Sequence, residues 1–127
     1  TVYEDGRQLR DYVNVHDVVA ANLLAMTSRK AAFEIFNVGG GKPVAVIEFA
    51  AEVRRLTETE APVVCGSYRR TDTRNAISDT AKLQALGWRP KYGFSDSIRD
   101  YVEWYTAEGF HRNADVAQLK SLRKGIR

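Results

Sequence analysis

The sequence contains few residues of the kinds that stabilise small proteins through covalent links or metals. Its 127 residues include one cysteine, Cys65, and two histidines. A single cysteine excludes a disulfide framework, and three soft ligands are too few for a four-ligand structural zinc site. No apolar run approaches the roughly 20 residues of a membrane-spanning helix, and no apolar signal segment opens the chain. We therefore expect neither a disulfide-rich or zinc-stabilised domain nor a membrane protein.

The phosphate-binding loops of nucleotide enzymes are also missing, although a glycine triplet at 39–41 precedes Lys42. A Walker loop needs a glycine where Phe36 stands and a serine or threonine where Pro43 stands. A dinucleotide fingerprint needs a third glycine at Val44. We interpret the triplet as a strand exit.

No pair of residues has the pattern of a catalytic nucleophile and its base. None of the tyrosines is followed four residues later by lysine, the spacing at which a lysine on the next helical turn lowers a tyrosine pKa. His16 next to Asp17 is typical of a helix start. Cys65 lies in an apolar run and is predicted to be a buried, inert thiol.

What the sequence does have is the composition of an ordinary globular domain, 44% hydrophobic and 28% charged. The formal net charge of +3 is unevenly placed, because residues 110–127 hold five basic side chains and only one acidic one, Asp115. The rest of the chain is slightly acidic, so the basic pI belongs to this segment. We predict that 110–127 is a basic, solvated C-terminal tail. Nucleic-acid binding through the tail is the least favoured alternative.

Periodicity and turn residues predict strands alternating with helices, which indicates an α/β protein. Extended segments are predicted at 1–3, 9–15, 33–38, 44–46 and 62–68. Helices are predicted at 16–29 and 47–58, from Asp79, from Ser95 as N-cap to Gly109, and in the tail through Val116, Leu119 and Leu122. We expect 33–38 to be a buried strand.

Two of these helices carry apolar stripes that we expect to face the core. Val19, Leu23 and Met26 form one stripe, which Ala20 and Leu24 widen. Ile98, Val102 and Tyr105 form the other, while Gly87 is predicted to end the short helix before it.

Arginines are the remaining chemical feature. Arg10 lies beside Asp11 on an extended segment, and residues 68–74 contain three further arginines and Asp72. Arginine forks bind phosphate oxygens in pairs and stay charged when partly desolvated, so diphosphate sites favour arginines from separate segments. Composition alone favours the alternative, in which these arginines and aspartates form ordinary surface ion pairs and bind no ligand.

Three ordered blocks resemble extended short-chain dehydrogenases/reductases, the NAD-dependent epimerases and dehydratases of nucleotide-diphosphate sugars. Residues 4–18 (EDGRQLRDYVNVHDV) are similar to the family's EDG…RDYV segment. Residues 36–43 (FNVGGGKP) are similar to its strand exit, and 68–90 (YRRTDTRNAISDTAKLQALGWRP) to its last block. The likeness covers roughly 1–106 and resembles the C-terminal part of these enzymes.

The resemblance implies a role for individual residues. Arg10 and Arg69 would contact the nucleotide diphosphate, with Arg69 chosen over Arg70, and Asp72 would contact the ribose. Gln8 and Arg74 are added as neighbouring candidates. Arg70 and Thr71 stand where the family has a glycine-containing spacer before the aspartate.

The resemblance also implies the architecture, cofactor and partners. Residues 1–109 would be the substrate-binding portion of a Rossmann-type epimerase or 4,6-dehydratase, with 33–38 joining a Rossmann sheet. NAD and the Tyr–Lys pair would lie upstream of Thr1, where the chain begins without methionine. This chain alone would then be a catalytically silent, cytoplasmic binder of a UDP- or dTDP-sugar that self-associates or docks to the Rossmann domain. A standalone non-catalytic sugar-nucleotide or partner-binding module is the alternative.

Overall fold

Short strands alternate with helices in the computed structural model, which describes residues 2–60, 62–67, 71 and 73–108. This confirms the predicted mixed α/β class. In chain order the elements are β1 (Val2–Tyr3), β2 (Leu9–Arg10), α1 (Val15–Thr27), the 3-10 turn η1 (Arg29–Ala31), β3 (Val44–Ala45), α2 (Val46–Leu56), β4 (Cys65–Ser67), α3 (Ala81–Ala85) and α4 (Phe94–Ala107).

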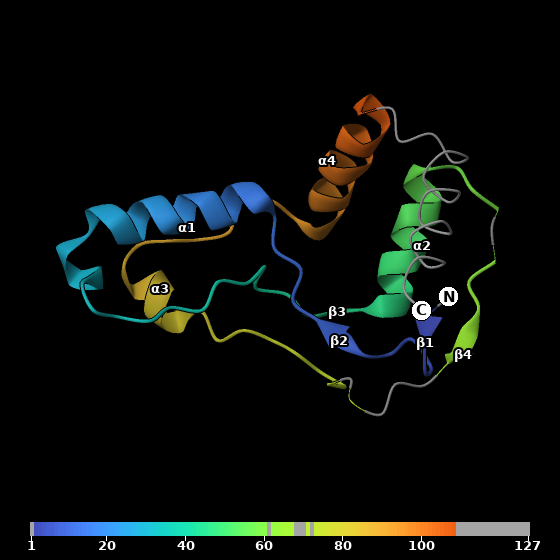
Figure 1. Cartoon of the computed structure of the whole chain (residues 1–127), viewed down its shortest axis with the longest axis horizontal. Helices are drawn as coiled ribbons and strands as arrows, with labels where there is room; N and C mark the ends of the chain where they lie inside the picture. Colours follow the sequence, from blue (N-terminus) through green and yellow to red (C-terminus); the bar gives the residue numbers. More distant parts are fainter. Residues whose placement is uncertain (1, 61, 68–70, 72, 109–127) are drawn as a thin grey trace, which may run out of the picture.

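The strands pair two by two and gather at one end of the molecule. β1 runs parallel to β4, and β2 runs antiparallel to β3 with Leu9 opposite Ala45. These strands lie with α2 and α4 at one end of an elongated structure, and α1, η1 and α3 lie at the other (Figure 1).

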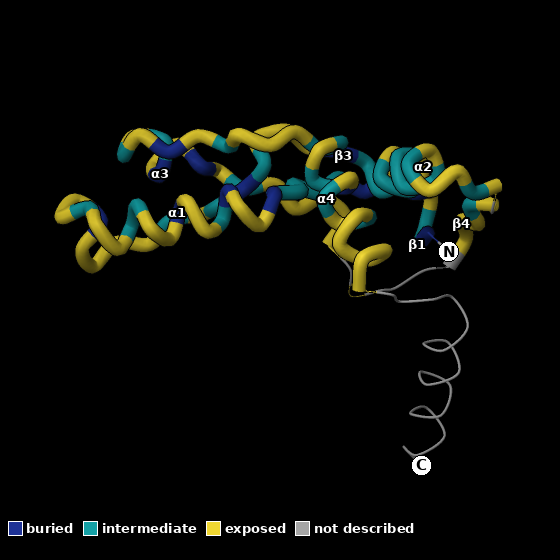
Figure 2. The backbone as a smooth tube through the Cα atoms, turned by 90° about the horizontal axis from the view of Figure 1, so that it is seen from above, coloured by how far each residue is buried: buried dark blue, intermediate teal, exposed yellow. Residues whose placement is uncertain are grey.

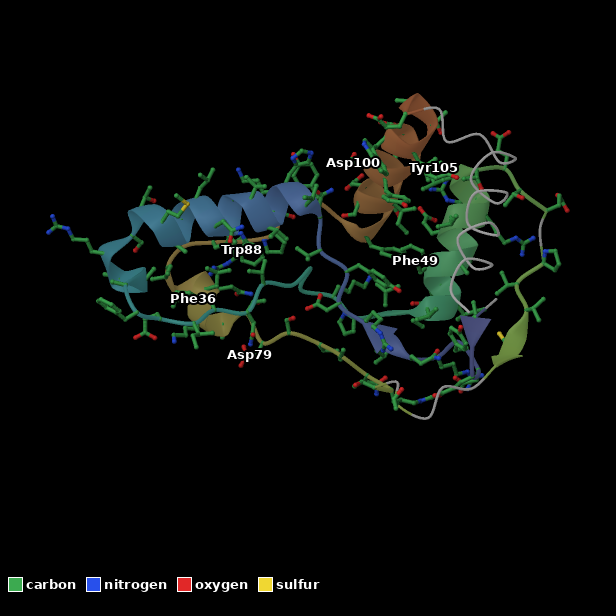
Figure 3. The ribbon with its side chains drawn as sticks, in the orientation of Figure 1. Phe36, Phe49, Asp79, Trp88, Asp100 and Tyr105 are labelled. Atoms are coloured by element: carbon green, nitrogen blue, oxygen red, sulfur yellow. The ribbon has the colours of Figure 1, made fainter. Side chains whose placement is uncertain are left out.

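The core of the α1 end is small and includes an aromatic side chain. Ala21 on α1, Leu83 on α3 and Trp88 are buried together, and Phe36 and Val38 pack against them. The Trp88 indole Nε1 donates to the backbone oxygen of Asp17 at 3.1 Å, which satisfies the polar end of a buried ring. Figure 3 shows Trp88 in the space between α1 and α3.

Three aromatic side chains pack together at the end of the molecule that contains the strands, α2 and α4. Tyr12, just after β2, stacks on Phe49 of α2 with ring centroids 4.8 Å apart, and Phe94 at the start of α4 lies 5.7 Å from Tyr12. α2 packs against α4 in this region. α2 begins where the Glu48 carboxylate accepts from the Ala45 backbone N–H at 2.9 Å.

The prediction that the Val19, Leu23 and Met26 stripe faces the core is wrong. All three side chains are exposed, Met26 at 81%, and the buried face of α1 carries Asp17 and Ala21 instead. Of the two residues that widen the predicted stripe, Leu24 packs against the core and Ala20 is exposed. A charged residue can occupy this face because the Asp17 carboxylate accepts two backbone N–H groups, from Lys91 at 2.9 Å and Tyr92 at 3.1 Å. Figure 2 shows the outer side of α1 largely exposed.

Residues 33–38 also differ from the expected buried strand. Phe33 has a left-handed φ of 61° and is fully exposed, as is most of Ile35, while Phe36 and Val38 are only partly covered. A strand requires a neighbour for its backbone groups, and within the described ranges no strand runs beside this segment.

Smaller expectations at other positions also need correction. Cys65 is exposed rather than buried, because β4 is a three-residue strand paired with β1. The N-cap of α4 is Gly93, not Ser95, since the Asp96 carboxylate reaches back to the Gly93 N–H at 3.2 Å. The strand predicted over 9–15 covers only Leu9–Arg10.

Other expectations agree with the structure or lie outside its described part. Gly87 ends the short helix with a left-handed φ of 99°, as predicted. Ile98 is buried as predicted, whereas Tyr105 is exposed. The basic tail 110–127, its helix and the closing Gly109 lie outside the described residues.

Candidate functional site

Arg10 is the best-defined member of the predicted diphosphate site. From β2 its guanidinium donates to three backbone oxygens, those of Leu9 and Arg74 from Nη1 and that of Thr73 from Nη2, each at 2.9 Å. Carbonyl oxygens orient the group without neutralising it. Among the described residues Arg10 forms no salt bridge.

The chain that follows the predicted 68–72 segment lies directly beside β2. The Leu9 N–H donates to the Asn75 side-chain oxygen at 3.0 Å, and the Ala76 N–H donates to the Leu9 oxygen at 3.0 Å. Arg10 and Ala76 form a parallel bridge. Residues more than 60 positions apart in sequence therefore meet here. Arg69 and Asp72 themselves lie outside the described residues.

Gln8 is buried at 5% exposure rather than presented at the surface. Its Nε2 donates to the Tyr3 backbone oxygen at 2.7 Å, while its Oε1 is buried with no hydrogen-bond partner. The side chain therefore fixes the end of β1 relative to β2.

Arg74 is held by acid residues of the turn between β1 and β2. Its Nη1 lies 2.5 Å from Glu4 Oε2 and 2.9 Å from Asp5 Oδ1, and its Nη2 lies 2.8 Å from Asp5 Oδ2. The hydrogen bonds from Arg74 and from the Arg7 backbone lower the pKa of Asp5 from 3.8 to about 2, and the same acids raise the pKa of Arg74.

The glycine triplet serves close packing rather than phosphate binding. A Cβ placed on Gly39 would lie 2.0 Å from the Asp11 carboxylate, and one on Gly40 would lie 1.8 Å from the Tyr12 backbone oxygen. Asp11 accepts from the Gly41 N–H at 3.2 Å and from the Ser78 N–H at 3.1 Å. The carboxylate thus joins the triplet to the 73–78 segment beside Arg10.

Sequence reasoning did not assign roles to Asp11, Asn14 or Glu4. Asn14 is the N-cap of α1, its oxygen accepting from the His16 N–H at 2.8 Å, and its Nδ2 donates to Asp100 of α4 at 2.8 Å. An asparagine directly before an amphipathic helix is a recognisable N-cap signal. The contacts of Asp11 and Glu4 join distant segments and have no such local signal.

The described part of the chain contains neither a clustered metal site nor a membrane-spanning helix. No group of three or more histidine, cysteine, aspartate or glutamate residues there is placed to hold a metal ion. None of the helices described is long and apolar enough to cross a membrane.

Comparison with known proteins agrees with this arrangement. The model of the NAD dependent epimerase/dehydratase family matches residues 1–39. A dTDP-L-rhamnose 4-epimerase from Burkholderia thailandensis is 28% identical over 113 residues, which cover 88% of this chain and 31% of that protein.

Solved structures are similar over most of the chain. UDP-glucose 4-epimerase from Thermotoga maritima, solved with UDP-glucose, matches with a TM-score of 0.77 and 34% identity over 84% of this chain and 35% of that one. UDP-glucose 4-epimerase from Thermus thermophilus, solved with NAD, matches with a TM-score of 0.69 and 34% identity over 77% of this chain and 32% of that one.

These matches define how far the likeness extends. The chain spans about a third of the length of the relatives and structures that it matches. The family model covers the Arg10 segment and the first glycine of the triplet. By sequence and by fold, the chain is similar to the C-terminal part of NAD-dependent epimerases and dehydratases, whose family model matches its first 39 residues.

Proposed function

We propose that this chain is the nucleotide-diphosphate-sugar-binding portion of an NAD-dependent sugar epimerase or 4,6-dehydratase. Arg10 and Arg69 would hold the diphosphate and Asp72 the ribose, with Gln8 and Arg74 as neighbouring candidates. Residues 1–109 would form this portion, and 110–127 a basic tail.

The observation that carries this proposal is the meeting of β2 with the segment that follows 68–72. The Arg10 guanidinium contacts the backbone oxygens of Thr73 and Arg74 at 2.9 Å. Arg69 precedes Thr73 by four residues and Arg74 by five in the sequence, and because one residue of extended chain spans at most about 3.5 Å, its backbone cannot lie farther than roughly 18 Å from these carbonyls. Two arginines from distant segments can then share one diphosphate.

NAD does not fit the glycine triplet of this chain. Gly39 and Gly40 lie against Asp11 and the Tyr12 backbone, so the space that a pyrophosphate would need is filled by the chain itself. The sequence also has no tyrosine followed four residues later by lysine. We propose that NAD and the catalytic base are held by residues outside this chain, and that the 127-residue chain alone turns over no nucleotide sugar.

The proposal is tested by titrating the 127-residue chain with UDP and with dTDP in a calorimeter. We expect weak binding, with a dissociation constant on the order of 1 mM. Arg69→Ala should weaken binding about tenfold, because it removes a charge-assisted contact with phosphate. Arg70→Ala is the matched control and should bind like the unchanged chain. A folded sample that binds neither nucleotide contradicts the proposal.

We also propose that the outer face of α1 docks onto the part of the family protein that this chain lacks. Val15, Val19, Leu23 and Met26 lie along this face and are exposed, and Phe33 and Ile35 follow at its end. Exposed apolar surface of this extent is typical of an interface. The chain covers about a third of its relatives, so the remaining part of such a protein is the occupant we propose.

A further inference from the structure

Next to the Arg10 guanidinium, one backbone N–H of β2 is bonded to a side chain where a regular ladder would use the main chain. Arg10 and Ala76 form a parallel bridge, and the Ala76 N–H donates to the Leu9 oxygen at 3.0 Å. If this ladder continued by two residues, the Leu9 N–H would donate to the backbone oxygen of Arg74. It donates to the side-chain oxygen of Asn75 at 3.0 Å. The Asn75 side chain therefore interrupts the ladder, a competition with the backbone that is typical of asparagine.

This exchange of partners leaves the Arg74 backbone oxygen to a different donor. Arg10 Nη1 donates to it at 2.9 Å, and Arg10 Nη2 donates to the backbone oxygen of Thr73 at 2.9 Å. Nη1 also donates to the Leu9 oxygen at 2.9 Å. Two of these three acceptors thus belong to the segment that Asn75 attaches to β2.

Asn75 lies between two other attachments of this segment, and neither of them reaches Leu9. The Ser78 N–H donates to the Asp11 carboxylate, and the Arg74 side chain pairs with acid residues of the turn before β2. Asn75 is itself exposed, so water can bond the Leu9 N–H when the side chain is removed. Loss of the Asn75 oxygen should therefore change the local register of 73–75 more than the stability of the fold.

From this geometry we infer that Asn75 is a positioning residue for Arg10. Its side-chain oxygen accepts from the Leu9 N–H and so leaves the Thr73 and Arg74 oxygens to hold the guanidinium in one orientation. A phosphate then meets a donor that is already ordered, and less side-chain entropy is lost on binding. This inference rests on the proposed function, in which Arg10 contacts the diphosphate.

The orientation of Arg10 is tested first without a ligand, by ¹⁵N NMR of the 127-residue chain. A guanidinium held by three acceptors rotates slowly about its C–N bonds, so Arg10 should give resolved Nη signals, assigned by their absence in Arg10→Lys. Asn75→Ala should merge these signals. Asn75→Asp, which keeps an oxygen for the Leu9 N–H, should preserve them. Signals that stay resolved in Asn75→Ala, or that are already merged in the unchanged chain, overturn the inference.

The second test measures UDP affinity by calorimetry. Asn75→Ala should weaken UDP binding about fivefold with little change in Tm, because the Arg10 side chain must then be ordered on binding. In an Arg10→Ala background the same change should have no further effect, since Asn75 acts through Arg10. Asn37→Ala is the matched control, because this exposed asparagine also bonds a backbone group, the Asp79 oxygen at 3.4 Å, and it should bind UDP like the unchanged chain.

The outcomes separate this inference from the proposed function. Unchanged UDP affinity in Asn75→Ala, or an equal loss with and without the Arg10 side chain, overturns the positioning role and leaves the proposed function standing. No UDP binding by the unchanged chain, or no loss in Arg10→Ala, defeats the proposed function. The Nη signals then still decide whether Asn75 orients Arg10.

Discussion

Asp17 is a carboxylate at 1% exposure that faces backbone N–H groups rather than a cation. It accepts from Lys91 and Tyr92, and its own backbone oxygen accepts from the Trp88 indole. A buried charge is tolerated when hydrogen bonds replace its hydration. This one residue therefore joins the start of α1 to the 88–92 segment that leads into α4.

Replacing Asp17 with alanine should destabilise the chain strongly. Two buried backbone N–H groups would lose their charged acceptor, and we expect the free energy of unfolding to fall by about 3 kcal/mol. Urea denaturation measures the change. Asp79→Ala is the control, because Asp79 accepts from the Ala81 N–H at an exposed position, and it should cost about 1 kcal/mol or less. Equal losses in the two variants would contradict the assigned role of Asp17.

At the scale of elements, α1 shows which features local patterns could and could not predict. The helix itself, with an asparagine at its start, follows from local residues, as do α2 and the glycine that ends α3. The buried face of α1 was not predictable from hydrophobicity, because burial of Asp17 depends on N–H groups more than 70 residues away. The strand predicted at 33–38 failed for a related reason, since a strand needs a partner that local sequence does not specify.

The candidate site likewise has features that the sequence predicts and others that only the structure shows. The resemblance chose Arg10, and the structure shows what orients it, the backbone oxygens of Leu9, Thr73 and Arg74. The arginine-rich segment also contains Arg74, which pairs with Glu4 and Asp5. This pairing depends on how the fold brings positions about 70 residues apart together, which residue types alone do not predict. The roles of Arg69 and Asp72 stay predictions.

Alanine substitutions at Leu83 and Leu23 test whether the inner or the outer face of the α1 end stabilises the fold. Leu83 on α3 is 1% exposed and lies in the core with Ala21 and Trp88, so Leu83→Ala should lower the free energy of unfolding by about 3 kcal/mol. Leu23→Ala removes the same atoms from the exposed face of α1 and should change it by less than about 0.5 kcal/mol. Thermal or urea unfolding of the monomeric chain at low concentration measures both. A larger loss for Leu23 would mean that the outer face belongs to the core.

At the scale of the whole molecule, large apolar side chains are exposed along α1 and at 33–35, as well as on α4 at Tyr101, Trp104 and Tyr105. The buried core at the α1 end consists of Ala21, Leu83 and Trp88, while the outer face of α1 and the 33–35 segment expose large apolar side chains. A chain that spans a third of its relatives and carries such a face has a surface suited to a partner, and copies of the chain are the partner available in a purified sample.

We therefore expect the purified 127-residue chain to self-associate, with a sedimentation coefficient that rises with concentration. Leu23→Lys combined with Met26→Lys should shift it toward the monomer, because two charges on the outer face of α1 oppose burial of that face. Val64→Lys combined with Ile77→Lys is the matched control, since these exposed apolar residues are not part of α1, and it should associate like the unchanged chain. Analytical ultracentrifugation over a range of concentrations separates the outcomes. An unchanged chain that stays monomeric and unfolds cooperatively would show that this face is stable in water, and the proposal that it docks a missing part of the protein would fail.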